Sequence, residues 1–130
     1  VYHKNAISSD VAYIRVILRK IEKHDFTIGI LGAKGIKCSR KDWPMDMVSY
    51  IGCTYHIMNG LNYKKVRIVF QPGDEMLVLV NRLDRKISFF RNRKTILTEP
   101  IPRSMVNECY FFFETATAGN TVSFPELGLS

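Results

Sequence analysis

The sequence predicts an all-β fold in which two antiparallel sheets pack face to face as a sandwich. Strand-like alternation of apolar and polar residues dominates the chain from its middle onward, as in Tyr63–Phe70. Turn signals such as Asn59-Gly60 and Pro72-Gly73-Asp74 separate these runs. Short strands at regular spacing, divided by turns of this kind, are typical of sandwiches and barrels.

The individual strands are predicted from short runs of bulky or β-branched residues. Met76–Val80 is apolar throughout, which favours a strand covered on both faces. Asp84-Arg85 marks a tight reversal before the next strand, in which Phe89 is expected in the core. The other predicted strands are Phe26–Leu31, Tyr50–Met58, Lys86–Arg91, Tyr110–Phe113 and Thr121–Phe124.

Two segments have no single assignment from pattern. After Asp10, the apolar residues from Val11 to Ile21 recur at helical spacing, yet they also alternate as a strand would, and periodicity leaves both interpretations open. Gly32–Val48 is the longest stretch without a regular pattern. Loops of that length tend to be functional, so this one is a candidate binding loop.

The chain is of a size that fits one domain. Its 130 residues, 46% of them hydrophobic, suffice to fill one core, so we expect a single domain over residues 1–130. The first residue is Val1, which indicates a piece of a longer protein. No apolar run of the sequence approaches the roughly 20 residues that a membrane span needs.

The cysteine count predicts neither a disulfide framework nor a metal site. Three cysteines are an odd number, and a chain of this length does not need staples, so we expect a reducing, intracellular compartment (cytoplasm or nucleus). Cys53 and His56 are three apart in a predicted strand and would point to opposite faces. No cofactor is expected.

Catalytic motifs are not found in the sequence. It contains no Gly-x-Ser-x-Gly elbow, phosphate loop or His-Glu-x-x-His motif, and its Gly29, Gly32 and Gly35 lack dinucleotide-binding spacing. The histidines fall in a terminus, a predicted turn and a predicted strand, and are His3, His24 and His56. The sequence therefore predicts a protein that is not an enzyme.

The formal net charge of +7 raises the question of an anionic partner. Positive potential attracts nucleic acid, anionic membrane or acidic peptide alike. The basic residues on or beside adjacent predicted hairpins are Lys64, Lys65, Arg67, Arg82, Arg85, Lys86, Arg91, Arg93 and Lys94. On one sheet face they would form a stripe able to follow phosphates, but a solvated outer face is the interpretation we favour.

Several motifs follow one another in an informative order. The runs Tyr13-Ile14-Arg15-Val16 and Phe26-Thr27-Ile28-Gly29 precede Ser49-Tyr50-Ile51-Gly52. Gly73-Asp74-Glu75-Met76 then begins one strand, and Ile87-Ser88-Phe89-Phe90-Arg91-Asn92 ends the next. Over nearly the whole chain, this order and spacing resemble the SPRY domain family.

This resemblance implies an SPRY-like antiparallel sandwich of the concanavalin-like jelly-roll type, and it makes the segment around Ile14 a strand. The subfamily is not assignable, because some motifs depart from the family pattern. Asn92-Arg93 stands where the family has Asn-Gly, so this turn must accept a side chain where glycine is usual.

The resemblance also implies a shallow pocket formed by loops at one end, which binds a peptide or loop of a partner protein. Lys34 would favour an acidic peptide, and Tyr63 either lines the pocket or packs on the sheet. The positions that match ligand-contacting segments of the family are Gly32, Ala33 and Lys34; Asn59, Gly60, Leu61 and Tyr63; and Thr117, Ala118, Gly119 and Asn120.

We therefore expect a protein–protein interaction module, as the substrate-recognition part of a ubiquitin ligase or as a scaffold. One alternative is a basic nucleic-acid-binding β-domain. The other is a lectin-like carbohydrate-binding sandwich, for which Trp43 and Tyr63 are the aromatic candidates.

Overall fold

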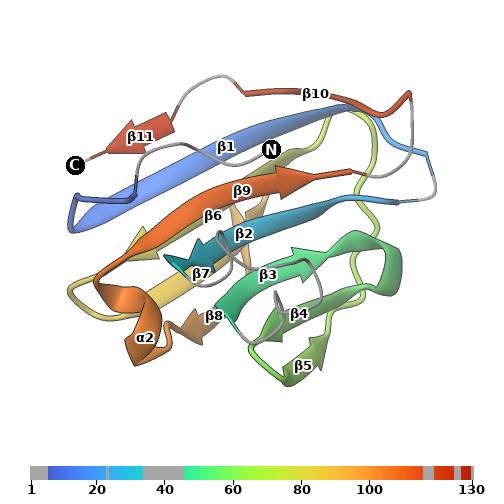
Figure 1. The fold of residues 1–130 in the computed structure, drawn as a ribbon. Helices are drawn as coiled ribbons and strands as arrows, with labels where there is room; N and C mark the ends of the chain where they lie inside the picture. Colours follow the sequence, from blue (N-terminus) through green and yellow to red (C-terminus); the bar gives the residue numbers. More distant parts are fainter. Residues whose placement is uncertain (1–5, 23, 34–45, 116–118, 125–126, 130) are drawn as a thin grey trace.

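The computed structural model describes residues 6–22, 24–33, 46–115, 119–124 and 127–129. They form two antiparallel sheets packed face to face (Figure 1). The first, here called the β1 sheet, runs in the order β10 (Thr121–Ser123), β1 (Val11–Lys20), β6 (Glu75–Asn81), β7 (Lys86–Arg91) and β8 (Lys94–Pro100), and β11 (Leu127–Leu129) also pairs with β1. The second, the β3 sheet, runs β5 (Asn62–Lys65), β4 (His56–Asn59), β3 (Met47–Ile51), β2 (Thr27–Gly32) and β9 (Cys109–Glu114). The predicted all-β sandwich is confirmed.

The segment that periodicity left open is a strand. In β1 the side chains of Ala12, Ile14, Val16 and Leu18 are buried, and the residues between them face outward. The β-branched residues suit a pleated surface, and the antiparallel pairing of β1 with β6 brings Ile14 opposite Val78. Burial of each such side chain is worth about 1.5–3 kcal/mol, which favours the strand over a helix that would expose part of the set.

One interior is shared by the two sheets. Val78 and Phe89 from the β1 sheet are fully buried against Tyr50 and Phe111 from the β3 sheet. The predicted core position of Phe89 is therefore confirmed. The partly buried residues packed against this cluster include Val66, Ile68 and Val122.

The apolar run Met76–Val80 forms most of β6, but it is not covered on both faces as predicted. Met76, Val78 and Val80 are fully buried, whereas Leu77 and Leu79 are half-buried. The alternation arises because β6 has the core on one face only, and its outward leucines lie on the outer face of the β1 sheet.

The predicted strand Tyr50–Met58 is two strands. A 3₁₀ turn at Gly52–Thr54 and a left-handed residue, Tyr55 with φ 57°, reverse the chain between β3 and β4. Tyr50 then lies directly opposite Ile57 and both enter the core. The run looked continuous because a hairpin returns its buried residues to the same sheet face.

The alternation predicted for Tyr63–Phe70 is correct for burial but wrong for pairing beyond Lys65. Strand β5 ends there, and residues 66–70 belong to no ladder, although the side chains of Val66, Ile68 and Phe70 still pack on the core. The backbone N–H of Phe70 donates a hydrogen bond to a side chain instead, with 3.0 Å between its nitrogen and Nε2 of His24.

Strand β8 was not among the predicted strands. Its pairing with β7 shifts register between Phe89, opposite Leu97, and Phe90, opposite Thr95. This bulge leaves Ile96 as an extra residue and interrupts the apolar–polar alternation that would have shown the strand. The short helix α2 (Arg103–Val106) follows it and leads to β9.

The loops gather at two ends of the sandwich. We call the end that carries the β4–β5 turn and the β6–β7 turn the first end. The second end carries the β3–β4 and β7–β8 turns and the connection from β9 to β10 (Figure 1). Most of the predicted long loop, residues 34–45 with Cys38 and Trp43, lies outside the described residues.

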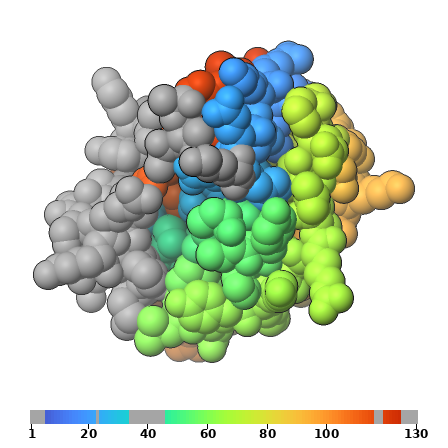
Figure 2. Space-filling model, turned by 90° about the vertical axis from the view of Figure 1, so that its right-hand side faces the viewer, coloured from blue at the N-terminus to red at the C-terminus, as the bar shows by residue number. Residues whose placement is uncertain are grey.

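A buried histidine joins three segments at the second end. His24 is 8% exposed, its Nδ1 donates to the Gly52 carbonyl at 2.8 Å, and its Nε2 accepts the N–H of Phe70. These two backbone partners define a neutral tautomer with the proton on Nδ1. Figure 2 views this end, where the segments around residues 24, 52 and 70 meet.

Candidate functional site

The structure does not bring the three predicted binding segments to one end. Strands β2 and β9 are antiparallel, with Thr27 opposite Glu114 and Gly32 opposite Cys109. Gly32 therefore lies at the first end, and the chain leaving Glu114 lies at the second. The expectation of a pocket formed at a single end by all three segments is wrong for this geometric reason. Lys34, Thr117 and Ala118 lie outside the described residues.

At the first end, two of the segments are neighbours. Leu31, beside the buried Gly32 and the half-buried Ala33, pairs with Met47, whose carbonyl accepts the N–H of Gly60 at 3.1 Å. The order of β2, β3 and β4 in the sheet thus places residues 32–33 and 59–61 at the first end of the sandwich. These contacts hold the β4–β5 turn on the scaffold.

The same turn is tied to the opposite sheet. The side-chain amide of Asn59 donates to the carbonyl of Pro100 at 2.8 Å, and Nζ of Lys64 contacts Oε2 of Glu99 at 2.7 Å. Both partners lie in β8, the edge strand of the β1 sheet. The two links close the sandwich where β5 and β8 meet, so this hairpin is held against the opposite sheet.

Two large apolar side chains project from this anchored turn. Gly60 has φ 59°, a conformation that costs a residue with a Cβ about 1 kcal/mol, and the turn it forms leaves Leu61 64% exposed. Tyr63 is 60% exposed, while the edge of its ring meets His56 with 5.8 Å between centroids. Tyr63 therefore packs on the sheet with part of its ring and presents the rest to solvent.

At the second end, Asn120 is occupied by internal hydrogen bonds. Its Oδ1 accepts the N–H of Glu22 at 2.6 Å, and its Nδ2 donates to the Asp25 carbonyl at 3.2 Å and to Oγ1 of Thr115 at 2.9 Å. Gly119 precedes it in a left-handed turn with φ 96°. Asn120 thus fastens the chain entering β10 to the chain entering β2.

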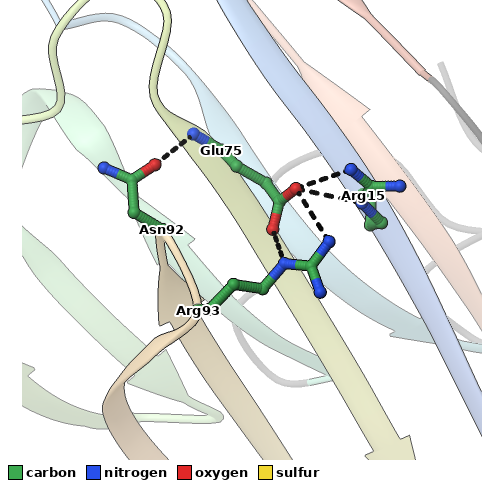
Figure 3. Close-up of polar contacts among 4 residues, drawn as sticks. All are labelled: Arg15, Glu75, Asn92 and Arg93. Carbon is green, nitrogen blue, oxygen red and sulfur yellow. Dashed lines mark hydrogen bonds and ion pairs between the residues drawn. The ribbon is translucent and has the colours of Figure 1, made fainter.

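The predicted basic stripe is interrupted by acidic side chains. Glu75 accepts hydrogen bonds from Arg15 (2.7 Å from Nη2) and from Arg93 (2.6 Å from Nε), and its N–H donates to Oδ1 of Asn92 (Figure 3). Beside it, Oδ2 of Asp74 accepts a hydrogen bond from Nε of Arg91 at 2.9 Å. Pattern alone missed this network because its members come from three strands.

The carboxyl groups of Asp74 and Glu75 are stabilised as anions. Partial burial raises the pKa of Glu75, but hydrogen bonds from Arg93 and Arg15, with their charges, outweigh it and hold that pKa below its ordinary value. For Asp74 burial is likewise outweighed, here by hydrogen bonds from Asn92, the Gln71 N–H and Arg91, so its pKa is also lowered.

Within the described residues of the predicted stripe, Arg85, Lys86, Lys94 and two cations beside β5 form no ion pair. Lys65 and Arg67 are exposed, and neither forms an ion pair within the described part of the chain. They line a shallow groove of about 280 Å³ where β5 ends. Its remaining wall consists of Tyr55, Val66, Ile68 and Val69.

The described residues provide hydrogen bonds, ion pairs and apolar contacts. No three of their His, Cys, Asp and Glu side chains group as metal ligands would. Burial raises the pKa of the Cys109 thiol to about 11, despite the opposing charge of Arg82, so this thiol stays protonated near neutral pH. None of the described helices has the length and apolar character to cross a membrane.

Comparison with known proteins relates the fold to solved structures. No protein-family model and no curated protein matches the chain. A human SPRY domain is 15% identical with a TM-score of 0.75, over 95% of this chain and 81% of that one. The SPRY domain of human HERC1 is 15% identical with a TM-score of 0.72, over 95% and 79%. Stonustoxin is 14% identical with a TM-score of 0.63, over 98% of this chain and 21% of that one.

At these identities the similarity concerns the fold. The chain has the SPRY-type β-sandwich, and the fold that the motif order implied is confirmed.

Proposed function

We propose that this chain is a non-enzymatic protein-interaction module whose first end binds a loop or extended segment of a partner protein. The observation that carries this proposal is the exposure of Leu61 and Tyr63, 64% and 60%, on a hairpin anchored to both sheets. Large side chains that are already ordered lose little entropy on binding, and such residues dominate the energy of many protein interfaces.

The residues that we assign to this surface lie at the first end of the sandwich. Leu61 and Tyr63 are the apolar contacts, Asn59 and Gly60 hold the turn, and Ala33, next to the buried Gly32, lies across β3 from that turn. The SPRY-type fold of the compared structures supports an interaction role, and we place the module in the substrate-recognition part of a ubiquitin ligase or in a scaffold.

The distribution of charge favours a protein partner over nucleic acid. A phosphate-binding stripe needs cations that are free to release counterions. Of the predicted stripe, Arg91 and Arg93 contact carboxylates, and Lys64 contacts Glu99. The cations of the predicted stripe are thus partly neutralised within the protein.

The proposal is tested by affinity capture with three forms of the chain, followed by quantitative mass spectrometry. We expect specific partners of the wild type to be lost from the double variant Leu61→Ser, Tyr63→Ala. Phe124→Ala is the matched control, since Phe124 is 49% exposed, contacts Phe113 towards the second end and belongs to none of the predicted binding segments. Partners retained equally by all three forms would contradict the assignment.

A further inference from the structure

Strand β5 is the last strand of the β3 sheet, and all four of its residues are exposed (Figure 1). Which of its backbone groups point outward follows from the ladder with β4. The N–H of Val66 donates to the carbonyl of Tyr55 at 2.9 Å, so these two residues form a hydrogen-bonded pair. Pairs alternate along an antiparallel ladder between hydrogen-bonded and non-hydrogen-bonded.

The alternation assigns the remaining pairs. His56 and Lys65 form a non-hydrogen-bonded pair, Ile57 and Lys64 a hydrogen-bonded one, and Met58 and Tyr63 again a non-hydrogen-bonded one. The N–H and C=O groups of Tyr63 and Lys65 therefore point away from β4. Within the described residues these four groups have no hydrogen-bond partner.

The groove described above begins where this edge ends, because Lys65 belongs to both. Its volume of about 280 Å³ is below the range of about 300–1,000 Å³ typical of small-molecule sites. Its apolar wall of Val66, Ile68 and Val69 suits one or two side chains of an extended chain. A strand added to β5 would continue past Lys65 into this groove.

Charge decides which strand this edge accepts. Lysines on an edge strand disfavour pairing with a second copy of the same chain, because two identical edges would bring like charges together. An acidic strand meets Lys65 and Arg67, which have no ion pair within the described residues, and suffers no such repulsion. The occupant that fits is an extended acidic segment of a different protein.

The geometry points to strand addition at β5: the free edge at Tyr63 and Lys65 pairs with an extended acidic segment of a partner protein, and the groove behind Lys65 takes one of its apolar side chains. This inference rests on the interaction function proposed above and specifies its partner chemistry. Main-chain hydrogen bonds supply affinity in this mode, and side-chain pockets supply selectivity.

The test uses a pool of fluorescent 12-residue peptides that carry Glu or Asp at alternate positions and Val, Ile, Leu or Thr between them. Binding is measured by anisotropy for Tyr63→Ala and Tyr63→Pro. Both variants lack the phenol ring, but only proline also removes the outward N–H, and an edge strand tolerates proline there. We expect the proline variant to bind at least tenfold more weakly than the alanine variant, with equal melting temperatures. Equal affinities overturn the inference.

Two further measurements do not depend on the proline variant. With the wild-type chain, NMR hydrogen exchange at the amides of Tyr63 and Lys65 should slow at least tenfold when the peptides bind. Peptides N-methylated at one set of alternate residues should bind at least tenfold more weakly than peptides N-methylated at the other set, because only one set of amides faces β5. Unchanged exchange, or equal affinities of the two methylated sets, overturns strand addition.

The charge component is tested with Lys65→Gln, Arg67→Gln, which should weaken binding about tenfold and lessen its salt dependence. Peptides with Lys in place of the acidic residues should not bind, and tighter binding of these would overturn the acidic assignment. Loss of captured proteins from the double variant Leu61→Ser, Tyr63→Ala but not from Tyr63→Pro would reject strand addition and keep the interaction function. No difference between the wild type and this double variant would reject the interaction function itself.

Discussion

The β7–β8 and β4–β5 hairpins both turn through residues with positive φ, but the turn side chains of the first contact the protein and Leu61 of the second is exposed to solvent. In β7–β8 the turn residues Asn92 and Arg93 have φ of 48° and 71°, and their side chains return to Asp74 and Glu75. In β4–β5 glycine takes the left-handed position, and the following Leu61 projects into solvent.

The difference shows how this protein separates stability from recognition. The β7–β8 turn accepts the cost of left-handed non-glycine residues because its side chains complete a network with Arg15 and Arg91. The β4–β5 turn forms no such side-chain network at Leu61 and Tyr63. Arg91 and Arg93 of the β7–β8 hairpin contact carboxylates of the same chain, whereas Lys65 and Arg67 beside the β4–β5 hairpin form no ion pair within the described residues.

The largest effect is expected where the network of the β7–β8 hairpin is broken. Glu75→Ala removes a carboxylate that contacts both Arg15 and Arg93, whose side chains are 21% and 67% exposed. We expect a loss of about 2 kcal/mol in the free energy of unfolding, less than for a fully buried pair because solvent reaches the site. Urea denaturation measures it. Glu22→Ala is the control, since that exposed carboxylate contacts only Lys20 among the ion pairs described and should change stability by less than about 0.5 kcal/mol.

Acid should weaken the same network by protonation. The pKa values of Glu75 and Asp74 are lowered in the folded chain from ordinary values of 4.5 and 3.8. A lowered folded pKa stabilises the protein above the unfolded pKa, and this contribution is lost as the pH falls through the folded pKa. Stability should therefore decline below about pH 4.5, and Glu75→Gln should flatten that decline. A pH-independent difference between the two forms would contradict the sign.

In the β4–β5 hairpin, replacing either of two adjacent lysines should change the free energy of unfolding by different amounts. Lys64→Met leaves the buried carboxyl of Glu99 without the cation at 2.7 Å, and we expect a loss of about 1.5 kcal/mol. Lys65→Met, one residue away and facing outward, should stay within about 0.5 kcal/mol. Chemical denaturation of the pair measures the difference. Equal losses would show that the link between β5 and β8 contributes nothing.

The turn conformations themselves carry the smallest effects. Gly60→Ala puts a Cβ on a residue with φ 59° and should cost about 1 kcal/mol. Arg93→Gly should change stability by less than about 0.5 kcal/mol, because relief of the left-handed residue offsets loss of its exposed ion pair. Thermal unfolding of both variants checks this. A large loss for Arg93→Gly would mean that its ion pair outweighs the backbone cost.

Local pattern predicted much of the fold. The Asn59-Gly60 and Pro72-Gly73 turns and the bounds of Lys86–Arg91 are in the structure. The segment around Ile14, which periodicity left open, is the strand that the family resemblance implied. Local pattern failed where tertiary contacts replace local rules. The break at Gly52–Thr54 depends on contacts with Phe26 and His24, and the irregular segment after Lys65 depends on a hydrogen bond from Phe70 to His24.

The candidate site was likewise predictable in part. Motif positions identified Asn59, Gly60, Leu61 and Tyr63 as a set, and these residues do lie together at the first end. Their distance from Asn120 was not predictable, because it depends on the antiparallel pairing of β2 with β9.

The sequence by itself determined that this chain forms a β-sandwich, because apolar periodicity and turn chemistry are local properties that survive any arrangement of the strands. Only the tertiary structure decided which cations are neutralised and which edge is left open. Those outcomes depend on strand order and register, which bring Glu75 to Arg15 and leave Tyr63 and Lys65 at the margin of a sheet.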